Sequence, residues 1–184
     1  MMAIGLASSG REVPFHNAAA SMHVGHLRFR SIQPSDRDFL YEVYTSTRKD
    51  EMSVLDWDST EKEAFLELQF NAQHRYYQEK FSNASFHIVL LDGVPIGRLY
   101  LDRRTDEIRI IDIALLMAHR NRGIGSNLME AILIEAQAAD LPVRIHVEMN
   151  NPALHLYKRL GFFQVSESGL YQLMEWKPEV SGAG

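Results

Sequence analysis

The chain has 184 residues, a net charge of −5 and 46% hydrophobic residues, which suits one domain with a substantial core. It has no cysteine, and this excludes a disulfide framework, a thiol nucleophile and a cysteine metal site. No run approaches the roughly 18 apolar residues of a membrane span, and the acidic balance argues against nucleic acid as the main partner. The start of the chain lacks the pattern of a signal peptide, so we expect a cytoplasmic protein.

The first 26 residues are small and polar, and they show no repeating pattern. We expect residues 1–26 to form a flexible N-terminal extension, with a contact in an oligomer as the alternative. A single domain is expected at residues 27–184. It begins with alternating apolar and polar residues at 27–30, which predict a first strand.

Two helices are predicted next. Ser35-Asp36 suits a helix start, and the apolar spacing that follows predicts a helix over residues 37–48. After a loop at residues 49–59, a longer helix is predicted over residues 60–80. We expect four residues to form its buried apolar face: Phe65, Leu68, Ala72 and Tyr76.

The rest of the chain alternates strands and helices. Asp92-Gly93 is typical of a tight hairpin turn between strands 86–91 and 95–102. In chain order, the later elements are expected to be strand 107–117, helix 123–139, strand 143–149, helix 152–160, strand 162–165 and strand 170–176. The order is therefore β-α-α-β-β-β-α-β-α-β-β.

A glycine-rich loop connects the fourth strand to the third helix, and it reads Arg120-Asn121-Arg122-Gly123-Ile124-Gly125. Two glycines at such a turn let the backbone approach a ligand without a Cβ in the way. The free N–H groups at the helix start form an anion site, and two arginines add positive charge. The loop therefore predicts a ligand that carries phosphates.

Three phosphate ligands compete for this loop. A P-loop needs a lysine after its last glycine, and none follows Gly125. A dinucleotide fold needs a third glycine where Leu128 stands. The third ligand is the pyrophosphate of coenzyme A. Indeed, the pattern Arg-x-x-Gly-x-Gly at residues 120–125 resembles the coenzyme A loop of the GNAT N-acetyltransferase superfamily.

A second block strengthens this resemblance. Residues 150–162 are similar to another GNAT pattern, Asn-x-x-Ala-x-x-Leu-Tyr-x-x-x-Gly-Phe, and they follow the loop at the expected distance. The resemblance extends over residues 27–178. It implies an α/β (α+β) GNAT fold with a mixed, mostly antiparallel central sheet of about six to seven strands. About four helices flank this sheet, which is splayed between the fourth and fifth strands.

The resemblance implies acetyl-CoA as a co-substrate and no metal. Backbone groups at the end of the fourth strand are expected to bind the pantetheine arm and the thioester. Asn150 and Asn151 either bind coenzyme A or only cap the following helix. The residues expected to bind the cofactor are Leu115, Leu116, Met117, Arg120, Arg122, Gly123, Ile124, Gly125, Ser126, Asn150, Asn151 and Tyr157.

Acetyl transfer to an amine also needs an acid for the leaving thiolate and a base for the amine. The family often uses a tyrosine at the position of Tyr157, which is protonated at neutral pH and can donate. Asp112 and His146 are the expected bases. Glu148 shares one strand face with His146, and each of these three residues also has a purely structural interpretation.

The resemblance thus implies an acyltransferase that moves an acetyl group to a primary amine by direct attack in a ternary complex. We expect a small molecule or an amino-acid-like amine as the acceptor. Alternatives are a protein N-terminal or lysine acetyltransferase, and a non-catalytic acyl-CoA-binding sensor. No nucleic acid or membrane partner is expected, and a homodimer through the sheet edge near Trp176 is left open. The expected lining of the acceptor pocket is Arg48, Glu51, Gln69, Gln73 and His87.

Overall fold

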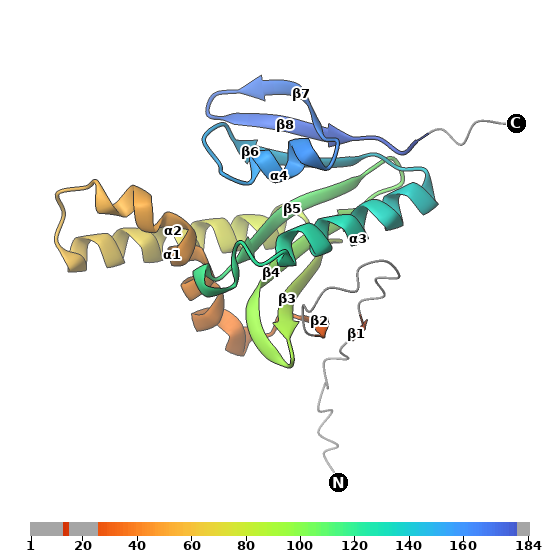
Figure 1. Ribbon diagram of the computed structural model, residues 1–184. Coiled ribbons are helices and arrows are strands. Elements are labelled where there is room, and N and C mark those ends of the chain that lie inside the picture. Colours follow the sequence, from red (N-terminus) through yellow and green to blue (C-terminus); the bar gives the residue numbers. More distant parts are fainter. Residues whose placement is uncertain (1–12, 15–25, 180–184) are drawn as a thin grey trace, which may run out of the picture.

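A central sheet crosses the protein, whose computed structural model describes residues 13–14 and 26–179 (Figure 1). Its strands lie in the order β1-β2-β3-β4-β5-β6-β8-β7. Neighbouring strands are antiparallel except β5 and β6, which are parallel. The strands are β1 (Val13–Pro14), β2 (Leu27–Ser31), β3 (Ser85–Leu91), β4 (Val94–Arg103), β5 (Ile108–Leu115), β6 (Val143–Glu148), β7 (Phe163–Ser168) and β8 (Tyr171–Trp176).

Seven of these strands are those predicted from the sequence, so the predicted fourth and fifth strands are β5 and β6. The additional strand β1 pairs with β2 and falls within the expected N-terminal extension. The rest of that extension, residues 1–12 and 15–25, lies outside the described residues, and so do residues 180–184.

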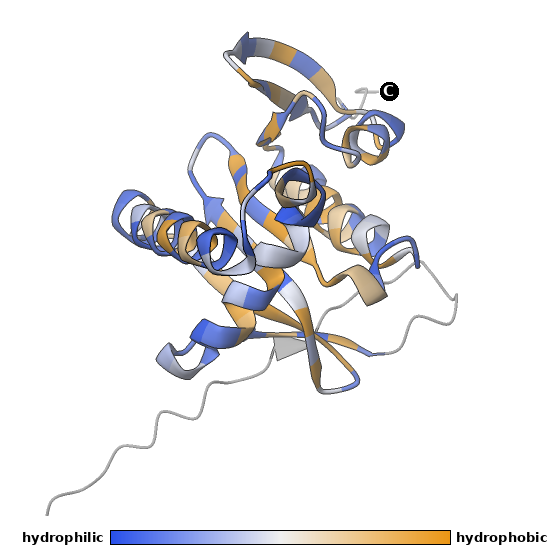
Figure 2. Ribbon diagram, turned by 90° about the vertical axis from the view of Figure 1, so that its left-hand side faces the viewer, coloured by the Kyte–Doolittle hydropathy of each residue, from blue (hydrophilic) through white to orange (hydrophobic). Residues whose placement is uncertain are grey.

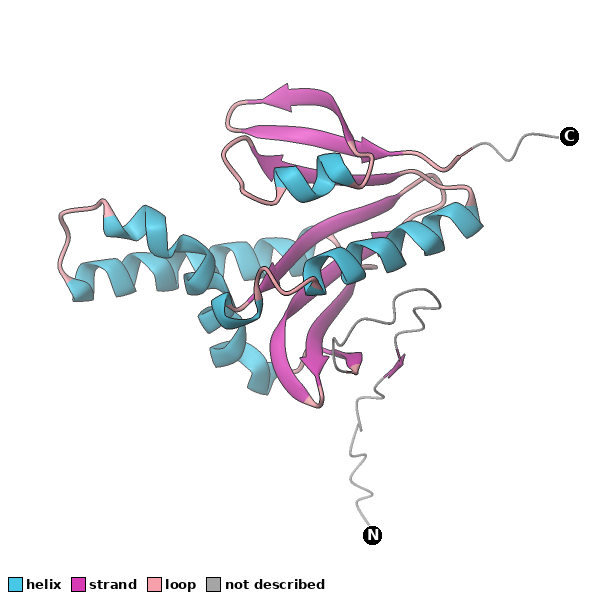
Figure 3. Cartoon of the chain, viewed as in Figure 1, coloured by secondary structure: helices cyan, strands magenta, loops and turns pink. Residues whose placement is uncertain are grey.

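Four helices cover the two faces of the sheet (Figure 3). They are α1 (Arg37–Ser53), α2 (Ser59–Lys80), α3 (Ile124–Ala139) and α4 (Leu154–Arg159). Short 3₁₀ turns precede α1 and α3, at Pro34–Asp36 and Met117–His119. Among residues 26–179, no helix is long and apolar enough to cross a membrane.

Strand alternation divides the core into two layers. Leu99 and Leu101 of β4 pack in the larger cluster with α3 and α4, whereas Tyr100 packs with α1 and α2. This is the period-two pattern of a sheet that is covered on both faces. The strands accordingly carry much of the apolar colouring in Figure 2. The two helix pairs therefore lie on opposite faces, α1 and α2 on one and α3 and α4 on the other.

The sheet opens between β5 and β6. Their pairing stops at Ile110 and Ile145, although β5 continues to Leu115 and β6 to Glu148. The register of β5 with β4 shifts at the same point and leaves Ile111 as a bulge, which bends a strand and ends regular pairing. Figure 1 shows the two strands diverging beyond this point. The predicted splay is confirmed.

The predicted buried face of α2 was wrong. Leu68 is 66% exposed and Tyr76 55% exposed, whereas Phe70 is fully buried and packs with Leu66 and Tyr77. Both sets have helical spacing, because apolar residues lie all around this helix. The periodicity alone therefore did not separate the face that meets the sheet from the face that meets solvent. The α1 helix also continues to Ser53, five residues beyond its predicted end.

Candidate active site

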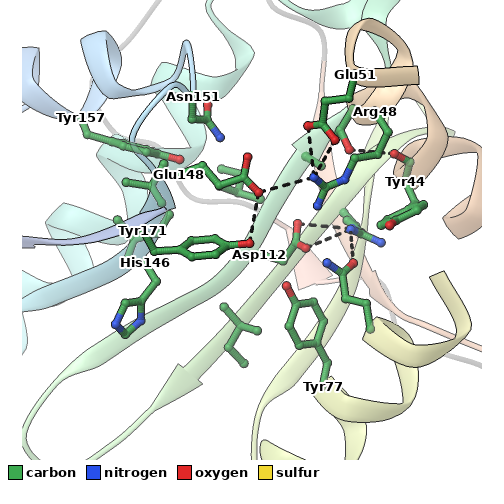
Figure 4. A pocket seen from close by; sticks show the side chains of 18 residues that line it. Tyr44, Arg48, Glu51, Tyr77, Asp112, His146, Glu148, Asn151, Tyr157 and Tyr171 are labelled. Carbon is green, nitrogen blue, oxygen red and sulfur yellow. Dashed lines mark hydrogen bonds and ion pairs between the residues drawn. The ribbon is translucent and has the colours of Figure 1, made fainter. Parts of the chain in front are cut away.

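A cavity of about 190 Å³ lies where β5 and β6 diverge (Figure 4). Side chains from both faces of the sheet and from both sides of the splay line it. This volume holds about six water molecules, at roughly 30 Å³ each, and so suits a small polar head group. Its lining includes Tyr44, Thr47, Arg48, Glu51, Gln73, Tyr77, Arg98, Asp112, His146, Glu148, Asn151, Tyr157 and Tyr171.

The glycine loop leaves free backbone N–H groups at the start of α3, which form a candidate anion site. Gly123 is the N-cap residue and has φ of 81°, a left-handed conformation that favours glycine. A Cβ at this position would meet no described atom within 4 Å, so the approach to the backbone is open. No side chain caps the helix, and the first-turn amides of Ile124, Gly125 and Ser126 have no intrahelical acceptor. The geometry therefore suits a phosphate group.

Cations lie beside this helix start, but they are not the pair Arg120 and Arg122 that the sequence indicated. Arg122 is exposed, and Arg159 of α4 donates to Ser126 Oγ at 3.2 Å. Sequence reasoning missed Arg159, because nothing in the linear pattern places the end of α4 next to α3. Ile124 is buried in the core, so only its backbone faces the anion site.

The guanidinium of Arg120 points into the protein. Its Nε donates to the carbonyl of Leu115 at 2.8 Å, and Nη2 reaches the carbonyl and hydroxyl of Ser46 at 3.2 and 3.0 Å. Burial lowers the pKa of Arg120. These bonds attach the loop to the end of β5 and to α1.

The three residues expected at the end of β5 differ in their surroundings. Leu115 is buried, and its carbonyl is the one that receives Arg120. The N–H of Leu116 donates to Ile96 of β4 at 2.9 Å. Because main-chain groups alternate in direction along a strand, the N–H of Leu115 faces the side that β6 leaves. Met117 begins the 3₁₀ turn, and its side chain is exposed.

Asp112 takes part in a buried ion pair. Its two carboxylate oxygens receive Arg98 Nε at 3.3 Å and Nη2 at 2.9 Å, and Arg98 also donates to Gln73 at 3.2 Å. The Arg98 side chain is buried, and the Asp112 carboxylate lines the cavity. Two opposite charges inside adjacent apolar strands are the sequence signal for this pair.

His146 lies at the cavity edge, but its ring is directed away from the centre (Figure 4). Its Nδ1 is 2.9 Å from Arg109 Nη1, and Arg109 in turn binds Glu107. Burial and the neighbouring Arg109 lower the pKa of His146. The predicted common face of His146 and Glu148 is confirmed by the burial pattern of β6, in which the intervening Val147 is buried.

Tyr157 and Asn151 both line the cavity from the segment around α4. Tyr157 is 4% exposed, and burial together with Asp112 raises its pKa, so the phenol stays protonated at neutral pH. Asn151 accepts from the N–H of Ala153 at 2.9 Å through its side-chain oxygen, which forms an Asx turn ahead of α4 rather than a helix cap. Asn150 is exposed and does not line the cavity.

A polar network crosses the opening from α1 to β6 and β8. Arg48 Nη1 lies 3.2 and 3.1 Å from the oxygens of Glu51 and 3.4 Å from Glu148 Oε1. The hydroxyl of Tyr171 donates to the same oxygen at 3.1 Å, and the Arg48 guanidinium lies over the ring of Tyr44. Sequence reasoning named Arg48 and Glu51 for this wall but missed both tyrosines. Of its other expected lining residues, Gln73 lines the cavity, and Gln69 and His87 do not.

Comparisons with known proteins agree with this geometry. The model of the Acetyltransferase (GNAT) family matches residues 49–162, which is more than half of the chain. Among solved structures, the PaiA N-acetyltransferase of Thermoplasma acidophilum in complex with coenzyme A is similar at 19% identity and a TM-score of 0.61, over 82% of this chain and 98% of that one.

Two further structures show the same fold. An acetyltransferase from Thermus thermophilus is 19% identical with a TM-score of 0.61, over 85% of this chain and 99% of that one. Ard1 from Thermoplasma volcanium is 22% identical with a TM-score of 0.54, over 84% and 99%. The family match, the splayed sheet and the glycine loop lead to one conclusion: this chain belongs to the GNAT acetyltransferase family.

Proposed function

We propose that this protein is an acetyl-CoA-dependent N-acetyltransferase that acetylates a primary amine by direct attack in a ternary complex. The observation that carries the proposal is the cavity at the splay. Tyr157 lines this cavity together with Arg48, Glu51 and Tyr171, and the candidate anion site of α3 follows β5 after a short loop. Because the chain has no cysteine, an acetyl-thiol enzyme intermediate is excluded. We place the reaction in the cytoplasm.

Coenzyme A would be held along the path from the anion site to the cavity. The first-turn amides of α3 and Arg122 suit the pyrophosphate. The outward-facing N–H of Leu115 suits the pantetheine arm or the developing oxyanion. Tyr157 would donate a proton to the leaving thiolate, since its raised pKa keeps it in the donor form.

The size of the cavity supports a small acceptor. Its volume of about 190 Å³ and its polar lining suit an amine head group. A small metabolite amine or an amino-acid-like amine is therefore the acceptor we propose. A protein N-terminus or lysine that inserts only its end into the cavity is the alternative.

Calorimetric titration of acetyl-CoA into the wild type and the Gly123→Val variant tests the cofactor site. Valine at φ of 81° adds strain and a branched side chain where the pyrophosphate is placed, so we expect affinity to fall by about 100-fold or more. Gly169→Val is the matched control. It lies in the β7–β8 turn at φ of 61°, it is also free of described atoms within 4 Å, and it should bind normally.

Two outcomes would count against the proposal. Equal affinity in the wild type and Gly123→Val would refute the loop assignment. Absence of binding by the folded wild type would reject acetyl-CoA as the co-substrate.

A further inference from the structure

We propose that Glu148 binds the ammonium group of the acceptor and takes its proton. This inference rests on the proposed acetyltransferase function and identifies the base of the same site. Glu148 lies on β6 beyond the last residue that pairs with β5, so its side chain faces the open part of the splay. Its side chain is 26% exposed, which leaves it accessible to an incoming amine.

The bonding of the Glu148 carboxylate suits this function. Oε1 accepts a hydrogen bond from the Tyr171 hydroxyl at 3.1 Å and a longer one from Arg48 Nη1 at 3.4 Å. Within residues 26–179, no hydrogen bond is made to Oε2. One oxygen is therefore fixed by a tyrosine, and the other has its lone pairs available for an N–H donor. Figure 4 shows this carboxylate between Tyr157 and Arg48.

The other two candidate bases are committed to cations. Both oxygens of Asp112 are bonded to Arg98, and the side chain is only 13% exposed. His146 presents Nδ1 to Arg109 and turns its ring away from the cavity centre. An amine that used Asp112 would compete with a guanidinium at hydrogen-bond distance, and the ring of His146 points away from the place where an amine would bind. Glu148 therefore offers the better access.

Arg48 is a positioning residue in this arrangement. It contacts both oxygens of Glu51 more closely than it contacts Glu148. An ammonium that binds Glu148 therefore replaces the longer contact, and Arg48 keeps Glu51 as its partner. When the acceptor binds, its ammonium group takes the place of Arg48 at Glu148. The Arg48 guanidinium still has Glu51 as its partner, so no guanidinium is left unpaired.

The proposed step balances in protons and electrons. Glu148 takes one proton from the acceptor ammonium, directly or through one water molecule, and frees the nitrogen lone pair. The nitrogen attacks the thioester carbonyl carbon; the N–C bond forms, the C–S bond breaks, and sulfur takes the electron pair. Tyr157 protonates the thiolate, and the second nitrogen proton restores Tyr157. Glu148 then releases its proton to solvent.

Several charged or titratable groups line the same cavity as Glu148. They come from every element around the cavity: Arg48, Glu51 and Tyr44 of α1, Tyr77 of α2, Arg98 of β4, Asp112 of β5, His146 of β6, Tyr157 of α4 and Tyr171 of β8.

The test compares Glu148→Gln with the wild type and with Glu135→Gln. Glu135 lies on α3 and pairs with Arg103, away from the cavity. Thiol release from acetyl-CoA is measured with the best acceptor from a panel of primary amines, from about pH 6 to about pH 9. Calorimetry gives the affinity for acetyl-CoA in each protein.

We expect Glu148→Gln to lower kcat/KM by about 100-fold or more while acetyl-CoA affinity stays unchanged. The loss in Glu148→Gln should be largest near about pH 6 and smaller near about pH 9, because a free amine has no ammonium proton to give up. The remaining activity should increase with pH as free amine accumulates. Glu135→Gln should behave as the wild type.

A kcat/KM within about threefold of the wild type, or an unchanged pH profile, would overturn the assignment. If acetyl-CoA binds but no amine releases thiol, the proposed function fails separately. Binding of butylammonium to the coenzyme A complex then decides the question for Glu148. Weaker binding to Glu148→Gln supports an ammonium site, and equal binding rejects it.

Discussion

Replacing Asp112 by asparagine separates a structural from a catalytic function of this carboxylate. The substitution keeps the shape but removes the charge that neutralises Arg98, which is 3% exposed and bonded to Asp112 at 2.9 and 3.3 Å. Gln73 is neutral, so it cannot compensate for the lost charge. Breaking a buried ion pair on one side costs about 3–5 kcal/mol. For a chain of this size, we expect the melting temperature to fall by about 10 °C.

Urea denaturation followed by circular dichroism measures this loss. The control is Glu135→Gln, which removes a half-exposed pair with Arg103 and should change the free energy of unfolding by less than about 1 kcal/mol. The double variant Arg98→Met/Asp112→Leu should recover most of the stability, since it leaves no unpaired charge. A loss below about 1 kcal/mol in Asp112→Asn would refute the structural function of the pair.

Three further predictions concern the loop and the tyrosines. Arg120→Ala should lower the free energy of unfolding by about 1–3 kcal/mol in urea denaturation, because it removes the bonds to Leu115 and Ser46. Arg122→Ala should leave stability intact and should weaken acetyl-CoA binding about tenfold in calorimetry, and the reverse pattern would contradict the contacts of Arg120. Tyr157→Phe should lower kcat about 100-fold with little change in acetyl-CoA affinity, and equal turnover would remove Tyr157 as the acid. Burial raises the pKa of Tyr77, and it raises that of Tyr100 to about 12, so the folded state retains protons that the unfolded state loses near pH 10. The contribution of these two tyrosines to the free energy of unfolding is therefore fully present below about pH 10 and falls as the pH increases further. Phenolate absorbance should appear at a higher pH in buffer than in urea. Coincident titration curves, measured while the protein keeps its native circular dichroism, would contradict this.

Local patterns predicted most of the secondary structure. The Asp92-Gly93 turn has both residues at positive φ, as its hairpin requires, and the glycine loop begins α3 within one residue of the prediction. These features depend on residues that are adjacent in sequence, so local sequence patterns indicate them. The splay followed from family resemblance rather than from any local pattern.

Contacts between distant segments were not predictable in the same way. The sequence marks Arg120 as a cation near a phosphate loop, but its bonds to Ser46 depend on how α1 packs against the loop. The contact of Tyr171 with Glu148 depends on the register of β6 with β8, which pairs these two residues directly. Such contacts are set by tertiary packing, and single-sequence periodicity carries no information about them.

The buried face of α2 shows the same limit within one element. Two apolar stripes fit the helical period, and the one with Phe70 meets the sheet. The choice between them depends on the aromatic partners Tyr44 and Tyr100, which come from other elements. Hydrophobic periodicity alone does not include those partners, and it therefore favours the stripe that faces solvent.

The most direct test of the central claim is amine-dependent thiol release from acetyl-CoA by the purified protein, with mass spectrometry of the products. A screen of small primary amines and amino-acid-like amines should yield at least one acceptor that gains an acetyl group as free coenzyme A appears. Gly123→Val should abolish this activity and Gly169→Val should keep it. Tight binding of acetyl-CoA without release of thiol for any amine would contradict the enzyme assignment and indicate an acyl-CoA sensor instead.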